Sequence, residues 1–118
     1  MRDFRKLEIC RIARDLNRVI YLLSNDFPKA EIYGLISQIR RASGSVSSNV
    51  AEGCGRKTTK DFISFLHNAM RSLKEVESQA FLTFDLNYLK KDVFDEVMEN
   101  TDKFGRKLNL FICSLDEK

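Results

Sequence analysis

Two clusters of basic residues are the part of this sequence best suited to binding an anionic partner. Arg40 and Arg41 form the first cluster, and Arg56, Lys57 and Lys60 form the second. Closely spaced guanidinium and ammonium groups neutralise phosphates. The second cluster also lies just before a predicted helix, whose free first-turn amides would add to an anion site. These five residues are therefore the predicted contacts with RNA or DNA phosphates.

A structural role for the same cations is the alternative. The loop at 56–60 can be solvated and paired within the chain to Glu52 and Asp61, and Arg40 and Arg41 can make intrachain contacts or join subunits through Glu52. The charge distribution favours an anionic partner, because the first sixty residues hold twelve Lys or Arg against six Asp or Glu, and the remainder hold eight against eleven. No aromatic residue alternates with these cations, so backbone or shape recognition is expected rather than base stacking.

The sequence offers little for catalysis or metal binding. It contains no His-Glu-x-x-His, phosphate-loop or nucleophile-elbow motif, and its single histidine, His67, has no acid at a characteristic spacing. Cys10, Cys54 and Cys113 are far apart in sequence and form no Cys-x-x-Cys pair. We therefore expect reduced, buried thiols rather than a disulfide framework or a zinc site. The prediction is a protein without enzymatic activity, cofactor or metal.

A group of residues at 38–52 predicts a contact between helices. Spacings of three and four place a stripe of amide, hydroxyl and charged groups beside a stripe of small side chains. Glycine in mid-helix costs about 1 kcal/mol relative to alanine, so Gly44 is expected to face a close helix of the same chain or of a second copy. Plain solvent exposure is the alternative. The predicted seam between subunits consists of Gln38, Gly44, Ser45, Asn49 and Glu52.

Four predicted helices with short connections position these residues. Pro28 can open the second helix, Thr58 can cap the third, and Asn87 can end the third in a left-handed conformation. The apolar stripe of the second helix includes Ile32 and accepts Ser43 as a small core residue. The pattern predicts an all-α fold, a single antiparallel up-down four-helix bundle domain over 1–118. Its helices are expected at approximately 4–24, 29–54, 60–86 and 91–115.

The composition is typical of a folded domain, and a cytoplasmic location is expected because neither a membrane span nor a signal peptide is recognisable. Of the 118 residues, 43% are hydrophobic and 31% are charged. The longest wholly apolar run, residues 19–23, is too short to span a bilayer, and the N-terminus lacks the apolar segment of a signal peptide. No membrane association is expected.

Several short motifs occur together along the chain. The most characteristic are Gln38-Ile-Arg-Arg-Ala42 and Ser48-Asn-Val-Ala-Glu-Gly53, with Asp26-Phe-Pro28 before them and Leu86-Asn-Tyr-Leu89 after them. With these motifs the chain resembles the small bacterial four-helix-bundle proteins encoded in intervening sequences of 23S ribosomal RNA genes. The resemblance covers nearly the whole chain. It departs from the family pattern at Cys10, where tryptophan is usual, and at Ser47, where proline is common, and it has Arg71 and Asn87 in place of usual glycines.

The resemblance implies a homo-oligomer, for which a ring of five is the form associated with the family. Relatives also serve as accessory proteins of diversity-generating retroelements, in which a basic ring is thought to bind nucleic acid and a reverse transcriptase. We therefore predict a non-enzymatic, oligomeric nucleic-acid-binding protein, with RNA as the first candidate ligand. The alternative is an oligomeric scaffold or adaptor for a partner enzyme such as a reverse transcriptase.

Overall fold

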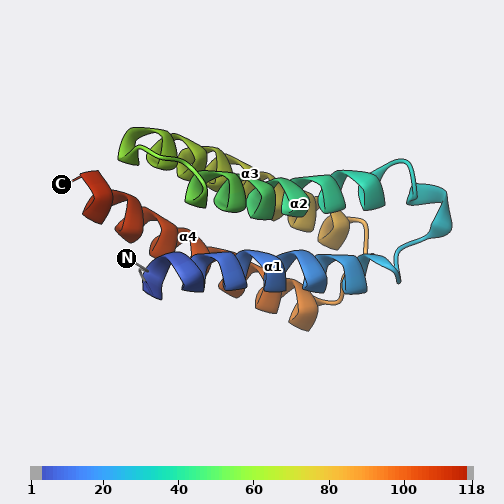
Figure 1. The fold of residues 1–118 in the computed structure, drawn as a ribbon. Coiled ribbons are helices and arrows are strands. Elements are labelled where there is room, and N and C mark those ends of the chain that lie inside the picture. Colours follow the sequence, from blue (N-terminus) through green and yellow to red (C-terminus); the bar gives the residue numbers. More distant parts are fainter. Residues whose placement is uncertain (1–3, 117–118) are drawn as a thin grey trace.

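Four long helices run alternately up and down in the computed structural model, which describes residues 4–116 (Figure 1). They are α1 (Phe4–Ser24), α2 (Leu35–Cys54), α3 (Thr59–Asp85) and α4 (Lys91–Asp116), with a short 3-10 helix, η1 (Lys29–Glu31), between the first two. The part of the chain that is described contains no strand. The predicted all-α, antiparallel four-helix bundle is thus confirmed.

The core lies along one stripe of each helix. In α3 the buried positions recur at spacings of three and four, because a helix turning every 3.6 residues returns such positions to one face. Ser43 is fully buried on α2 among branched side chains, and its hydroxyl donates a 2.8 Å hydrogen bond to the Asn17 side chain of α1. The largest fully buried apolar residues are Ile9, Ile20, Ile39, Leu66, Leu73, Phe104 and Leu108.

The second helix begins later than predicted. The sequence predicted its start at 29, but α2 starts at Leu35, after η1 and a turn. Ile32, expected on the core stripe, is consequently 54% exposed. The physical reason is the anchoring of the connection, since Phe27 is buried and Pro28 has an extended backbone.

The Glu31 carboxylate helps to hold this connection in place. One oxygen accepts a hydrogen bond from the Leu35 backbone N–H at 3.4 Å, in the first turn of α2. The other oxygen accepts one from the Tyr88 hydroxyl at 3.1 Å, in the turn between α3 and α4. The Tyr88 pKa is raised above its usual value, chiefly because this hydrogen bond favours the protonated phenol. The irregular segment is therefore tied to a second turn at the same end of the bundle.

The ends of α3 follow the sequence prediction closely. The Thr58 hydroxyl oxygen accepts a hydrogen bond from the Asp61 backbone N–H at 3.2 Å, as expected of a helix cap. Asn87 has a φ of 64°, the left-handed conformation predicted for it. The adjacent Tyr88 N–H donates to the Thr83 carbonyl at 2.8 Å, which closes the last turn. The observed bounds of α3 and α4 lie within one residue of those predicted.

Candidate nucleic-acid interface

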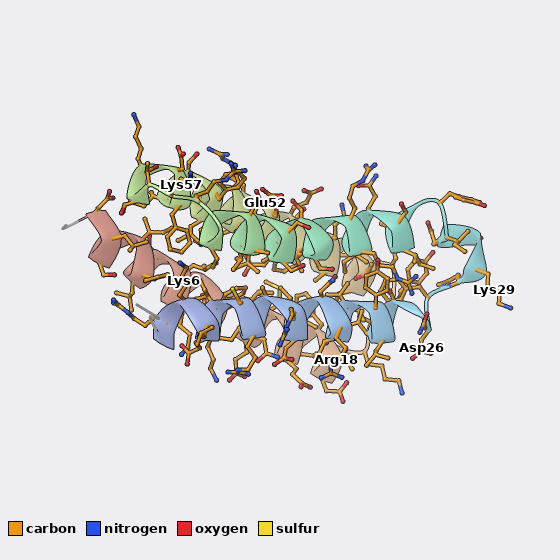
Figure 2. The ribbon with its side chains drawn as sticks, viewed as in Figure 1. Lys6, Arg18, Asp26, Lys29, Glu52 and Lys57 are labelled. Atoms are coloured by element: carbon orange, nitrogen blue, oxygen red, sulfur yellow. The ribbon has the colours of Figure 1, made fainter. Side chains whose placement is uncertain are left out.

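The second basic cluster lies at the turn between α2 and α3, at one end of the bundle (Figure 2). Arg56, Lys57 and Lys60 are all exposed there. Within residues 4–116, neither lysine makes an ion pair or a side-chain hydrogen bond. The first-turn amides of Thr59 and Lys60 also lack an acceptor within the helix. The turn therefore presents two unpaired ammonium groups beside the positive end of α3.

Arg56 is already engaged within the chain. Its guanidinium is 2.9 Å from a Glu52 carboxylate oxygen and lies 4.6 Å from the ring centre of Phe65. The pair with Glu52, predicted from the sequence as an alternative, is present, whereas Asp61 forms no salt bridge with the cluster among the described residues. Both partners of the Arg56–Glu52 pair are exposed, at 43% and 59%. Such a pair contributes only about 0.3–0.5 kcal/mol, so a phosphate can compete for this arginine.

Two further cations from the start of α1 lie at the same end of the bundle. Because α1 runs antiparallel to α2, its first turns lie beside the last turn of α2 (Figure 1). The Lys6 ammonium is 5.3 Å from the ring centre of Phe62, in the first turn of α3. The Arg5 guanidinium lies 5.1 Å from the ring centre of Phe111 of α4. Neither cation was predicted from the sequence, because Phe62 and Phe111 are distant in sequence from α1 and their proximity to it depends on helix pairing.

The arginine pair of the first cluster is split between two environments. Arg40 Nε donates a 2.8 Å hydrogen bond to the fully buried Ser24 hydroxyl, and one terminal nitrogen donates to the Asn25 side chain at 2.8 Å and the Tyr21 carbonyl at 3.2 Å. Its guanidinium also stacks 4.6 Å from the Tyr21 ring centre. Arg41 is exposed and makes no such contact within residues 4–116. Arg40 thus joins α2 to the end of α1, and Arg41 faces solvent.

The predicted seam on α2 is also divided. Ser45 and Ser72 share a 2.8 Å hydrogen bond between α2 and α3, and the Asn49 amide donates to the Ser45 carbonyl at 2.8 Å, so these residues serve a contact within the chain. Gln38 and Glu52 are exposed. A Cβ atom built at Gly44 would meet no atom within 4 Å apart from its chain neighbours and the nearby backbone of α2 itself. The intrachain explanation for this mid-helix glycine is therefore excluded, and a contact with a second copy remains a prediction.

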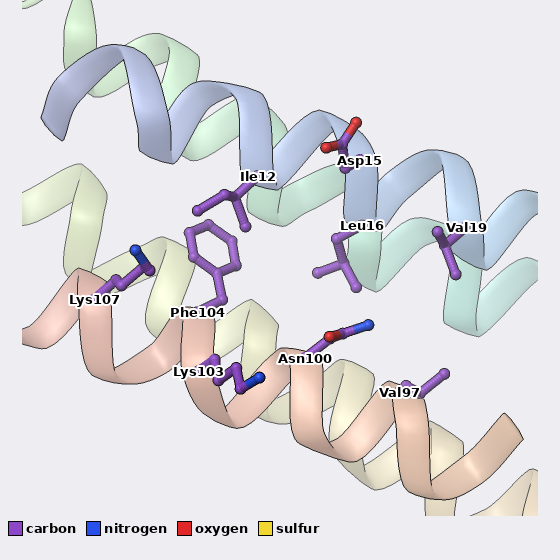
Figure 3. A pocket seen from close by; sticks show the side chains of 9 residues that line it. All are labelled: Ile12, Asp15, Leu16, Val19, Val97, Asn100, Lys103, Phe104 and Lys107. Atoms are coloured by element: carbon purple, nitrogen blue, oxygen red, sulfur yellow. The ribbon is translucent and has the colours of Figure 1, made fainter. Parts of the chain in front are cut away.

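An apolar hollow of about 300 Å³ lies between α1 and α4 (Figure 3). Figure 3 shows Ile12, Leu16 and Val19 of α1 facing Val97 and Phe104 of α4, and other residues of the lining are charged or polar. These two helices contact each other much less than the other neighbouring pairs do. No sequence pattern predicted this hollow, which arises from the splay of the first and last helices.

The burial of the cysteines differs from the sequence prediction. Cys10 and Cys54 are only partly buried, and Cys113 is exposed, so the prediction of buried thiols was wrong for Cys113. The sulfur atoms of Cys10 and Cys54, distant in sequence, are 3.4 Å apart. His67 is exposed. No group of three metal-ligating side chains gathers in the region from 4 to 116.

None of the helices described in residues 4–116 has both the length and the apolar character needed to cross a membrane.

Comparison with known proteins shows to which group the chain is related. A search of curated proteins gave no match. Among solved structures, a protein of unknown function from the S23 ribosomal protein family of Bacteroides thetaiotaomicron VPI-5482 is similar, with a TM-score of 0.85. The two share 17% sequence identity over 92% of this chain and 97% of that one, so the likeness concerns the fold. The family model described as 23S rRNA-intervening sequence protein matches residues 5–110, and the chain belongs to this family.

Proposed function

We propose that this protein is a non-enzymatic, oligomeric nucleic-acid-binding protein whose first candidate ligand is structured RNA. The observation that carries the proposal is the pair of exposed, unpaired lysines, Lys57 and Lys60, beside the start of α3, with Lys6 at the same end of the bundle. The family description refers to 23S ribosomal RNA, which makes RNA the first choice. The proposal keeps the protein in the cytoplasm, as the sequence suggests.

The contacts in this proposal are made to phosphates rather than to bases. The aromatic rings at this end are unsuited to stacking on bases, because Phe62 is buried and Phe65 lies beneath the Arg56 guanidinium. Lysine acts on phosphate as a flexible point charge and carries no base preference. Recognition is therefore expected to follow the shape of the RNA backbone, with little dependence on sequence.

The test is fluorescence anisotropy of the purified protein with a structured RNA and with duplex DNA, over a salt series. We expect log Kd to rise linearly with log salt, with a slope of roughly 0.7–0.9 for each phosphate contacted. A protein using Lys57, Lys60 and Arg56 should give a slope of about 2 or more per protomer. Absence of binding to either nucleic acid at low salt would remove the proposal.

Assembly through the outer face of α2 is the second part of the proposal. Gly44 has open space where a side chain would begin, and the exposed Ser48, Ala51 and Gly55 follow it at spacings of three and four. Small side chains allow the backbone of another helix to approach closely. The charged Glu52 and the amide of Gln38 flank this stripe and provide polar partners for a second copy. The number of subunits implied by the family resemblance is five.

Replacing Gly44 with leucine is expected to weaken self-association without unfolding the protomer. The new side chain enters open space in the free protomer but fills the space that a neighbouring helix needs. Overpacking costs typically 1–3 kcal/mol, which corresponds to roughly five- to 150-fold weaker association. Sedimentation velocity over a dilution series measures this change. Ser78→Leu, on the exposed face of α3, is the matched control. Equal association by the two variants would place the subunit contact elsewhere.

A protein adaptor is the second candidate function, and the α1–α4 hollow is the observation that favours it. Its apolar lining suits a hydrophobic side chain or helix from a partner enzyme. Burial of apolar surface is insensitive to moderate salt, whereas phosphate binding weakens steeply with it. A partner complex that survives high salt, in a protein that binds no RNA, would favour this second function.

A further inference from the structure

The pair formed by Cys10 and Cys54 is a chemical feature that the proposed function does not use. Cys10 lies in the second turn of α1 and Cys54 is the last residue of α2, and antiparallel packing brings their sulfur atoms to 3.4 Å. Two sulfur atoms in a disulfide are about 2.05 Å apart, so the sulfur atoms must approach by roughly 1.4 Å to form the bond. Both residues are partly exposed, which gives small solutes access to the pair.

We propose that Cys10 and Cys54 are a reversible disulfide site, closed by exchange with a low-molecular-weight disulfide. In the first step the Cys10 thiolate attacks one sulfur of the small disulfide, forming a mixed disulfide and releasing one thiolate. In the second step Cys54 loses its proton to the released thiolate or to water and attacks the Cys10 sulfur, which expels the second small thiolate. The protein loses two electrons, and one small disulfide is reduced to two thiols.

The order of attack follows from the surroundings of Cys54. Burial, together with the hydrogen bond to Cys10, raises the pKa of the Cys54 thiol to about 12. Cys54 therefore stays protonated near neutral pH, and its S–H can donate to the Cys10 sulfur. This keeps Cys54 inert until a mixed disulfide at Cys10 lies within reach. In a reducing cytoplasm the pair is accordingly a dithiol at rest and closes only under oxidising conditions.

The disulfide would fix the end of α2 to the start of α1. Gly55 and Arg56 follow Cys54 directly, so the crosslink lies next to the basic turn, the α2–α3 turn that carries Arg56, Lys57 and Lys60. It also closes a loop that spans more than forty residues, which restricts the unfolded chain considerably. For a protein of this size we expect the melting temperature to rise by roughly 10 °C on oxidation and to return on reduction. This inference does not depend on nucleic-acid binding.

The experiment uses the full chain carrying Cys113→Ser, which removes the exposed thiol and leaves the pair intact. The protein is incubated with oxidised glutathione, alkylated under denaturing conditions and digested with trypsin without reduction. The expected product is a crosslink between the peptides 7–11 and 42–56, which contain Cys10 and Cys54. Both free thiols disappear together, the protein remains a single chain on a non-reducing gel, and dithiothreitol restores both thiols.

Single replacements separate the proposed steps. With Cys54→Ser added, the mixed glutathione disulfide should accumulate on Cys10, and with Cys10→Ser added, Cys54 should react far more slowly. Three results would overturn the proposal: both cysteines alkylated in full after oxidation, stable glutathione adducts on each without a crosslink, or a crosslink only between two chains. Circular dichroism of each variant verifies that the fold is retained, and the parent protein gives the crosslinking result without any change to the pair.

Discussion

Replacing Arg40 with methionine is expected to lower the free energy of unfolding by about 1.5–3 kcal/mol. Hydrogen bonds that involve a charged group are worth this much, and removal of one partner leaves the other without compensation. Here the fully buried Ser24 hydroxyl loses the 2.8 Å hydrogen bond that its oxygen accepts from Arg40 Nε, and it keeps only its own donation to the Tyr21 carbonyl at 3.2 Å. Methionine retains most of the apolar stem, so the loss reports the guanidinium contacts rather than packing. Urea unfolding followed by circular dichroism measures the change.

Arg41→Met is the matched control for this prediction. Arg41 is adjacent in sequence, carries the same charge and is exposed without a partner within residues 4–116, so its replacement should change stability by no more than about 0.5 kcal/mol. The pair also separates two roles for Arg40. If Arg40→Met leaves stability unchanged and weakens RNA binding at the same time, the guanidinium serves phosphates and the Ser24 contact is unimportant.

The helices were predictable because local signals and core periodicity agree along most of the chain. The two ends of α3 are determined by single residues that can be identified in the sequence. The Thr58 hydroxyl caps the start, and Asn87 tolerates the left-handed backbone that ends the helix. The start of α2 was not predictable in this way. Ile32 continues the helical spacing, yet the course of the chain there is set by Phe27 and by the contact of Glu31 with Tyr88, fifty-seven residues later.

The site residues show the same division between local and tertiary information. Arg56 and Glu52 are four positions apart on one helix face, so their ion pair could be predicted from the spacing. Three other features depend on the pairing of α1 with α2. They are the hydrogen bond from Arg40 to Ser24, the proximity of Lys6 to the basic turn, and the contact of Cys10 with Cys54. Spacing within one helix assigns residues to a face. It does not say which residues of a neighbouring helix lie opposite that face, because register is decided by packing of the whole core.

Replacing Lys57 and Lys60 together with glutamate is expected to weaken binding to structured RNA by about 25-fold or more at 0.1 M salt. Each lost phosphate contact also lowers the salt slope by about 0.7–0.9, so the double variant should lose about 1.4–1.8. The fold should tolerate both changes. Lys57 is exposed in the turn, and Lys60 lies in the first turn of α3, where a negative charge interacts favourably with the helix dipole. Anisotropy titrations at several salt concentrations provide both values.

The matched control places the same charge change at the opposite end of the bundle, with Lys29→Glu and Lys90→Glu. Both lysines are exposed, and Lys29 lies far from Lys57 along the bundle (Figure 2). The two double variants have equal net charge, so any general electrostatic attraction between protein and RNA falls equally in both. A loss confined to the Lys57 and Lys60 variant locates the contact at the α2–α3 turn. Equal losses in the two variants would mean that RNA affinity depends on total charge alone, and would contradict a binding site at the α2–α3 turn.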